Sequence, residues 1–212
     1  MTPERKARIE AVAACRQVDL TVFMEKVHKP HNVAAILRTC DAVGVMRAHA
    51  VPPTGGIPAL NHTAQGAQRW VELVRHRDAA SGLSALRQAG FRLYAAHFSE
   101  RAVDFRQPDY TQPSAIVMGT EKFGVSEQTL EAVDGEIVIP MLGMTQSLNV
   151  SVATALILFE AQRQRQAAGM YKPRSLDESP WKELSESWIA RDLARRKTAP
   201  ESEPGSLADN QG

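Results

Sequence analysis

Cysteines are scarce in this 212-residue sequence, and long apolar runs are absent. The two cysteines have neither metal-ligand spacing nor a C-x-x-C arrangement, which argues against a disulfide framework. We read Cys15 and Cys40 as small core residues of a protein in a reducing compartment, the cytoplasm. There is no run of about 18 apolar residues, and the basic N-terminus has no apolar core behind it. We therefore expect neither a membrane span nor a signal peptide.

An excess of charge of one sign is also missing. The 25 lysines and arginines nearly balance the 24 aspartates and glutamates, so the formal net charge is +1. The field of the whole molecule therefore does not predict a nucleic-acid partner, and such a role would need local basic patches. Patches of this kind occur in the first helical segment, near residue 165 and near the C-terminus. Solvated helix faces are the alternative explanation for them.

Common nucleotide-binding and hydrolase motifs are absent or incomplete. Gly119 and Gly124 have P-loop spacing and Ser126 fits the hydroxyl position, but Val125 stands where the lysine is required. No G-x-G-x-x-G follows a predicted strand, and there is no G-x-S-x-G elbow or H-E-x-x-H. The histidines are scattered, so we expect no metal site.

Segments of strand and helix character alternate along the chain. The run 115–119 is almost continuously apolar, which is typical of a strand buried on both faces of a parallel sheet. Other strands are expected at 20–27, 48–51, 71–76, 91–97 and 137–139. Helices are expected at 3–17, 33–43, 63–69, 81–88, 126–133 and 148–168. The sequence thus predicts an α/β domain with a mostly parallel sheet flanked by helices.

The composition changes near both ends of the chain. Trp181 and Trp188 belong to an apolar pattern that predicts one amphipathic helix, which would pack on the domain or on a partner. After Ala199, residues typical of disorder dominate. We expect a basic N-terminal helix at 1–18, the main domain at 19–170, a helical extension at 171–198 and a disordered tail at 199–212.

Three polar segments follow predicted strands. One contains Asn32, a residue suited to a helix N-terminus, together with Arg38. The second is 119–124, and the third runs from 139–141 to 147–149. Each alone is explained by a helix cap, a surface cation or turn-forming glycines. The third segment, in which a strand breaks at Pro140 and a helix begins after Ser147, has the layout of a ligand site at the end of a parallel sheet.

Together these segments resemble the three motifs of the SPOUT superfamily of RNA methyltransferases. The stretches 24–32, 38–44, 118–122 and 146–153 resemble, within it, the TrmH family of tRNA guanosine-18 2′-O-methyltransferases. The resemblance extends from about Arg5 to Tyr171. It implies a deep trefoil knot, a homodimer with the active site near the subunit interface, S-adenosyl-L-methionine as methyl donor, and tRNA as substrate.

The resemblance also implies roles for individual residues. The cofactor would be held by backbone groups and apolar contacts of Ala96, His97, Gly119, Ile139, Met141 and Leu148. The catalytic set would be Arg38, Asn32, Glu121, Ser147 and Asn149. RNA phosphates would be bound by Arg5, Arg8, Arg16, His31, Arg163, Arg165 and Arg174.

Arg38 is the central catalytic residue in this interpretation, and its chemistry admits two roles. A guanidinium is so weak an acid that it normally stays charged, so deprotonation to act as a base needs a strong local perturbation. We favour an electrostatic role in which its fork holds a phosphate and the developing oxyanion.

Three alternatives are weighed. The first is the same chemistry on ribosomal RNA or another tRNA position, because the motifs define methyl transfer rather than the target. The second is a non-catalytic RNA-binding module of the same fold, against which the intact catalytic set argues. The third is an unrelated α/β nucleotide-binding protein, which the failed phosphate-binding motifs disfavour.

Overall fold

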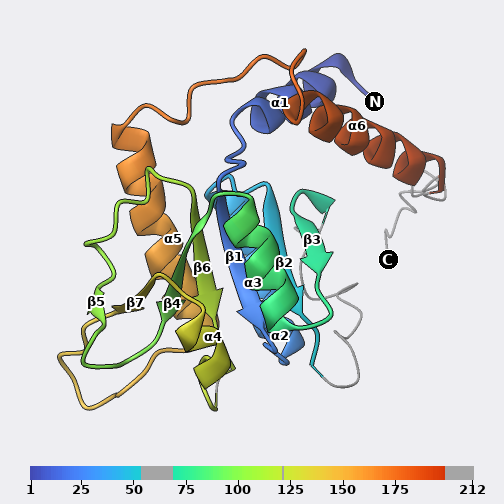
Figure 1. Ribbon diagram of the computed structural model, residues 1–212. Helices are drawn as coiled ribbons and strands as arrows, with labels where there is room; N and C mark the ends of the chain where they lie inside the picture. The colour runs from blue at the N-terminus through green and yellow to red at the C-terminus, as the bar shows by residue number, and fades with distance from the viewer. Residues whose placement is uncertain (54–68, 121, 199–212) are drawn as a thin grey trace, which may run out of the picture. The chain divides into compact units, whose positions relative to one another are not determined.

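The computed structural model describes residues 1–53, 69–120 and 122–198 (Figure 1). The helix predicted near Thr63, the catalytic candidate Glu121 and the tail at 199–212 lie outside these residues. The chain forms two compact units, one from Cys15–Pro173 and one that joins Met1–Ala14 to the segment from Arg174 onward. None of the described helices combines the length and the apolar character that crossing a membrane requires.

The larger unit is built on a parallel sheet. Its order, within the described residues, is β3-β2-β1-β6-β4-β7-β5, and every neighbouring pair is parallel. The strands are β1 (Leu20–Glu25), β2 (Arg47–Val51), β3 (Glu72–Arg75), β4 (Arg92–Ala96), β5 (Val103–Asp104), β6 (Ser114–Met118) and β7 (Gly135–Val138). The predicted α/β class with a parallel sheet is confirmed.

Two strands form the centre of this sheet. β1 and β6 pair from Leu20 opposite Ser114 to Met24 opposite Met118, and every residue in both strands is buried. Continuous apolar sequence suits this position, because helices cover both faces. Successive side chains point to opposite faces, so Met24 and Phe23 belong to different cores.

The helices form a layer on each face of the sheet (Figure 1). α2 (Pro30–Ala42) and α5 (Val150–Ala167) cover the face with the larger core, where Leu37 and Ile157 are fully buried. α3 (Ala79–Gln88) and α4 (Glu127–Glu131) lie on the other face, where Leu83 and Leu86 pack in the second core. Ser126 caps α4, its side chain accepting a hydrogen bond from the Thr129 N–H.

Two local expectations are wrong. The strands expected from sequence do not include Val103–Asp104, which forms the short edge strand β5 paired with β7. α2 begins at Pro30, so Asn32 lies inside the first turn rather than capping the helix. Proline fixes a helical φ and has no N–H that needs a partner, which explains the earlier start.

The described part of the smaller unit contains two helices, α1 (Pro3–Ala14) and α6 (Trp181–Thr198), which pack together. Trp188 and Ile9 are buried, and the Arg5 guanidinium lies 3.0 Å from the Asp192 carboxylate. The apolar pattern around Trp188 is thus explained by burial within this unit.

Candidate active site

The predicted site segments gather at the carboxyl edge of the sheet, the lower edge in Figure 1. Because all strands are parallel, the loops after β1, β4, β6 and β7 leave from this edge. Such an edge presents backbone groups that no strand partner uses, and it is the usual ligand position in open α/β sheets.

A hydrogen bond joins the first and third segments. Asn149 Nδ2 donates to Asn32 Oδ1 at 3.2 Å, across 117 residues of sequence. Asn32 is only 1% exposed, whereas Asn149 is exposed and caps α5 by accepting from the Ser151 N–H at 2.9 Å. The contact therefore fixes the start of α5 to the first turn of α2.

The second segment is a tight hairpin with its base at Thr120 and Gly124. These two residues exchange backbone hydrogen bonds of 2.9 and 3.0 Å, and Gly124 has a φ of +68°. A Cβ added to Gly119 would lie 2.0 Å from the carbonyl carbon of Gly124. Glycine is therefore required at 119 because the returning chain fills the space of a side chain.

The third segment, residues 139–149, is largely exposed to solvent before α5 begins. Ile139, Met141 and Leu148 are half-buried, while Leu142 and Met144 are fully exposed. No backbone N–H from 139 to 148, all of them described, donates a hydrogen bond within the described chain. The segment thus offers several backbone donors beside apolar side chains, which suits a ligand with a polar, heteroaromatic group.

The end of β4 lies beside both other cofactor segments. The N–H of His97 donates to the carbonyl of Ile137 at 3.1 Å, and Ala96 is the register partner of the same residue. His97 Nδ1 is 3.9 Å from where a Cβ on Gly124 would be. Ala96, His97, the hairpin and the beginning of the third segment are thus brought together.

Arg38 is not brought to the Asn32–Asn149 contact by its own chain. It lies on α2 six residues after Asn32, which corresponds to about 9 Å along the axis and about 240° of rotation. Its side chain is exposed, and within the described part of the molecule it makes no hydrogen bond or ion pair. Ser147 is likewise exposed, and its carbonyl accepts from Thr145 Oγ1 at 2.9 Å.

The prediction of an RNA contact is wrong for Arg165. Its side chain is 0% exposed and forms an ion pair with Asp19. Its Nε donates to the Tyr110 carbonyl at 2.7 Å, and a terminal nitrogen donates to Gln17 Oε1 at 3.0 Å. This arginine ties the end of α5 to the beginning of β1 and cannot reach a phosphate.

Arg16 is also buried rather than available to RNA. It pairs with the Asp41 carboxylate and donates to the Val45 carbonyl at 3.1 Å. The prediction therefore fails for this residue too. In both cases a basic residue in a helical pattern was assigned to the surface, because its acidic partner is distant in sequence.

The other basic candidates remain accessible. Arg8, His31, Arg163 and Arg174 are exposed, and Arg5 is half-buried beside Asp192. Arg163 pairs with Glu160 at 2.8 Å, and this hydrogen bond lowers the pKa of the Glu160 carboxyl. In the smaller unit, the Arg174 guanidinium lies over the Trp181 ring at 5.6 Å from its centroid.

Two features of the larger unit have no counterpart in the sequence predictions. Val152, Leu156 and Phe159 form an exposed apolar stripe on α5, which their i, i+4, i+7 spacing could have indicated. Glu25 at the end of β1 is buried, and an acidic residue closing an apolar run was the available signal.

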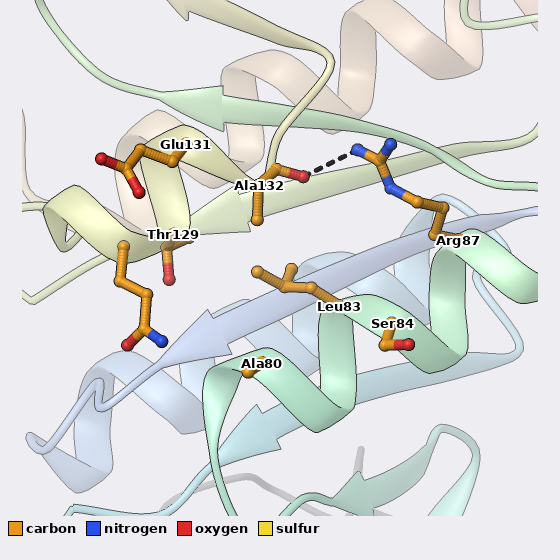
Figure 2. A pocket seen from close by; sticks show the side chains of 8 residues that line it. Ala80, Leu83, Ser84, Arg87, Thr129, Glu131 and Ala132 are labelled. Atoms are coloured by element: carbon orange, nitrogen blue, oxygen red, sulfur yellow. Dashed lines mark hydrogen bonds between the residues drawn. The ribbon is translucent and has the colours of Figure 1, made fainter.

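A groove of about 320 Å³ lies between α3 and α4 (Figure 2). Leu83 and Ala132 line it, and the Arg87 guanidinium at its end donates to the Ala132 carbonyl at 2.8 Å. None of the predicted site residues lines it.

Comparisons with known proteins identify the family of the chain. The chain matches the SpoU rRNA Methylase family over residues 19–159. It is 54% identical over 190 residues to a Thermus thermophilus protein named tRNA (guanosine(18)-2′-O)-methyltransferase, and the match covers 90% of this chain and 98% of the relative. Among solved structures it is similar to the Aquifex aeolicus TrmH/SpoU tRNA modifying enzyme, with a TM-score of 0.83, 41% identity and coverage of 90% and 97%.

A more distant similarity concerns a structure with a bound ligand. The SpoU methyltransferase AviRb from Streptomyces viridochromogenes, solved in complex with the cofactor AdoMet, has a TM-score of 0.63 and 26% identity. The match covers 73% of this chain and 64% of that one.

Proposed function

The chain belongs to the SpoU rRNA methylase family, and on this premise we propose that it methylates the ribose 2′-hydroxyl of guanosine 18 in the D-loop of tRNA. S-adenosyl-L-methionine is the proposed methyl donor. The observation that carries the proposal is the Asn149–Asn32 hydrogen bond, which assembles two of the three motif segments at the carboxyl edge of the sheet. The relative that is 54% identical, named as such an enzyme, supports the choice of target.

The residues at this edge suit S-adenosyl-L-methionine. The unused N–H groups of 139–148 fit the acceptor nitrogens of an adenine, and the half-buried Ile139, Met141 and Leu148 offer apolar contact. Ala96, His97 and Gly119 close the same space from β4 and the hairpin. When bound, the cofactor supplies an activated methyl group. The proposal requires no metal ion.

The chain's own residues then have to orient the ribose and stabilise charge. A ribose hydroxyl is a weak nucleophile, so the site must stabilise the oxyanion or remove the proton. We assign to Arg38 the stabilisation of the developing negative charge, because its guanidinium can bind a phosphate and the nascent oxyanion together. Asn32, Ser147 and Asn149 orient these groups. Glu121 stays a candidate for the same task.

A homodimer explains how Arg38 reaches the site. Within one chain Arg38 and Asn32 lie on different sides of α2, and the α5 stripe of Val152, Leu156 and Phe159 is 42–50% exposed. Pairing of two copies through these helices would cover the stripe and place the active site near the interface. An exposed patch of this kind is typical of an interaction surface.

The tRNA partner requires phosphate contacts. We propose Arg5, Arg8, His31, Arg163 and Arg174 for this role, with the helical unit of α1 and α6 as an RNA-binding extension. A cytoplasmic location follows from a tRNA substrate.

We also propose the trefoil knot implied by the family. Its support is topological: β7 pairs with both β4 and β5, and Gln164 of α5 accepts from the Tyr110 N–H in the connection between β5 and β6.

One experiment tests the function. The protein is incubated with methyl-labelled S-adenosyl-L-methionine and an unmodified tRNA transcript, and the labelled nucleotide is mapped. Label on the ribose of guanosine 18 is expected, and a transcript with 2′-deoxyguanosine at that position should remain unlabelled. Label on another nucleotide of the tRNA, or label that appears only when ribosomal RNA replaces the transcript, would assign the chemistry to a different target. RNA binding without any label would identify a non-catalytic module and overturn the proposal.

A further inference from the structure

Glu25 is a buried acidic residue outside the proposed catalytic set. It is the last residue of β1, and it is only 4% exposed. A carboxylate at such a position needs hydrogen bonds to offset its desolvation. Both of its oxygens have partners on one residue: Ser126 donates from its N–H to Oε2 at 3.0 Å and from its hydroxyl to Oε1 at 2.6 Å.

Ser126 marks the end of the 119–125 hairpin and the start of α4. Its hydroxyl oxygen accepts from the Thr129 N–H at 3.3 Å, which caps the helix, and it lies 3.1 Å from Thr129 Oγ1. The Glu25 carboxylate thus holds the point where the hairpin ends, across 101 residues of sequence.

The hairpin has two fixed ends and an exposed tip. Its first end continues from β6, whose Met118 is the register partner of Met24 in β1. Its second end is held by Glu25 and by the buried Val125. Phe123 at the tip is 78% exposed, so packing of the tip does not fix the loop. The position of Gly124, which exchanges hydrogen bonds with Thr120 and fills the space beside Gly119, therefore depends on the second end.

We propose that Glu25 is a positioning residue for the methyl donor: its carboxylate, acting through Ser126, holds the hairpin so that Gly119 faces the cofactor position. The inference rests on the proposed function, since Gly119 is taken to contact S-adenosyl-L-methionine. The Glu25 carboxylate acts through its geometry rather than its charge, because both groups that donate to it, the Ser126 N–H and hydroxyl, are neutral.

Substitutions separate geometry from charge. In Glu25→Gln the carbonyl oxygen can accept from the Ser126 N–H while the amide donates to the Ser126 hydroxyl oxygen, so both contacts survive without charge. Glu25→Ala removes both contacts. Ser126→Ala keeps only the backbone contact. Thr21→Val serves as the matched control, because Thr21 is buried near the other end of β1 and its hydroxyl donates to the Arg47 carbonyl at 2.8 Å, with a longer contact of 3.5 Å to the Val22 carbonyl.

Two quantities are measured on the full-length protein. Calorimetry gives its affinity for S-adenosyl-L-methionine, and hydrogen exchange without ligand gives the protection of the 120–129 amides. Glu25→Ala is expected to weaken affinity about tenfold or more, as loss of a buried hydrogen-bond pair implies, and to accelerate exchange at Gly124 and Ser126. Glu25→Gln should stay within about threefold of wild type and Ser126→Ala should fall between them. The double variant Glu25→Ala/Ser126→Ala should bind S-adenosyl-L-methionine no more weakly than Glu25→Ala alone.

Kinetics give a second readout. In Glu25→Ala the KM for S-adenosyl-L-methionine should rise about tenfold while kcat at saturation changes less than about threefold, the signature of lost binding rather than lost chemistry. Equal affinity in Glu25→Ala and wild type, equal weakening in Glu25→Gln and Glu25→Ala, or equal weakening in Thr21→Val would each overturn the proposal. Failure of the wild type itself to bind S-adenosyl-L-methionine would instead reject the proposed function.

Discussion

The two ends of the Asn149 amide have different partners. Its oxygen caps α5 through the Ser151 N–H, and its nitrogen donates to Asn32. One side chain therefore contributes to helix stability and to the assembly of the site. These contributions can be separated because serine is an equally good cap but is too short to reach Asn32.

We predict that Asn149→Ser keeps the melting temperature but lowers methyl transfer. Misplacement of a catalytic group by about 1 Å can cost about a hundredfold in rate, so a loss of tenfold to a hundredfold is expected. Asn149→Ala should lose the same activity and about 1 kcal/mol of stability in addition. Denaturation and a tRNA methylation assay measure the two effects. Full activity in Asn149→Ser would contradict the role assigned to the Asn32 contact.

Arg165 and Arg163 make a matched pair two residues apart, one buried and one exposed. Arg165→Ala should destabilise the fold by about 3 kcal/mol, because it leaves the Asp19 carboxylate and several carbonyls without their donor. Arg163→Ala should change stability by less than about 0.5 kcal/mol, since exposed ion pairs contribute little. Urea denaturation of both variants measures this difference.

The two variants should also differ in RNA binding. Arg163→Ala should lower the slope of log affinity against log salt by about one unit, as loss of one phosphate contact requires. Arg165→Ala, in the fraction that remains folded, should leave this slope unchanged. A reduced slope for Arg165→Ala alone would reverse the assignment of these two residues.

At the scale of elements, the hairpin after β6 depends on the absence of a side chain at 119. The clash of an added methyl group would be with backbone atoms of Gly124, which cannot move without opening the hairpin. Gly119→Ala should therefore abolish measurable S-adenosyl-L-methionine binding in calorimetry. Gly143→Ala, whose added methyl group has nothing within 4 Å, should leave the melting temperature unchanged and controls for the substitution itself.

A contact between β2 and the residue that follows β3 predicts a pH dependence of stability. His49 Nδ1 and His76 Nε2 lie 2.8 Å apart, and burial, with smaller effects of His76 and Arg47, lowers the pKa of His49 to about 4 from an ordinary 6.5. Between these values the unfolded chain binds more protons than the folded one. Stability is therefore full above pH 6.5 and falls as pH decreases towards 4.

His49 is partly exposed, so solvent screening reduces the effect to about 1–2 kcal/mol. Denaturant unfolding at pH 7 and pH 4.5 should show this loss. His49→Gln should reduce the difference between the two pH values, whereas substitution of the exposed His31 by Gln should not. An unchanged pH profile in His49→Gln would contradict the prediction.

The elements that could be predicted from sequence are those whose pattern is local. The apolar run at 115–119 indicated the central strand β6 because burial on both faces needs no knowledge of its neighbours. The burial of Arg165 could not be predicted, because it depends on Asp19, 146 residues earlier in the chain. The Glu25–Ser126 contact could not be predicted either, because it joins residues 101 positions apart. The pairing of Asn32 with Asn149 required the strand order, which follows from packing rather than from local sequence.

At the scale of the whole molecule, the α5 stripe predicts self-association. Leu156→Glu should convert the proposed dimer to a monomer in size-exclusion chromatography with light scattering, because a charge would be buried in an apolar interface. Methyl transfer should be lost while the melting temperature falls little. Leu193→Glu on α6, at a similarly exposed position in the smaller unit, should remain dimeric and serves as the control. A dimeric, active Leu156→Glu protein would exclude this surface as the interface.

The central position of β1 has a consequence for synthesis of the chain. One edge of this fully buried strand pairs with β2. The other edge can pair only after β6, whose last residue is Met118, has been synthesised. Translation proceeds at about 5–20 residues per second, so the apolar edge of β1 stays unpaired for several seconds on the ribosome. Long-range parallel pairing is intrinsically slow and exposed to aggregation during that interval. We therefore expect the nascent first half of the chain to be prone to aggregation until residue 118 has emerged.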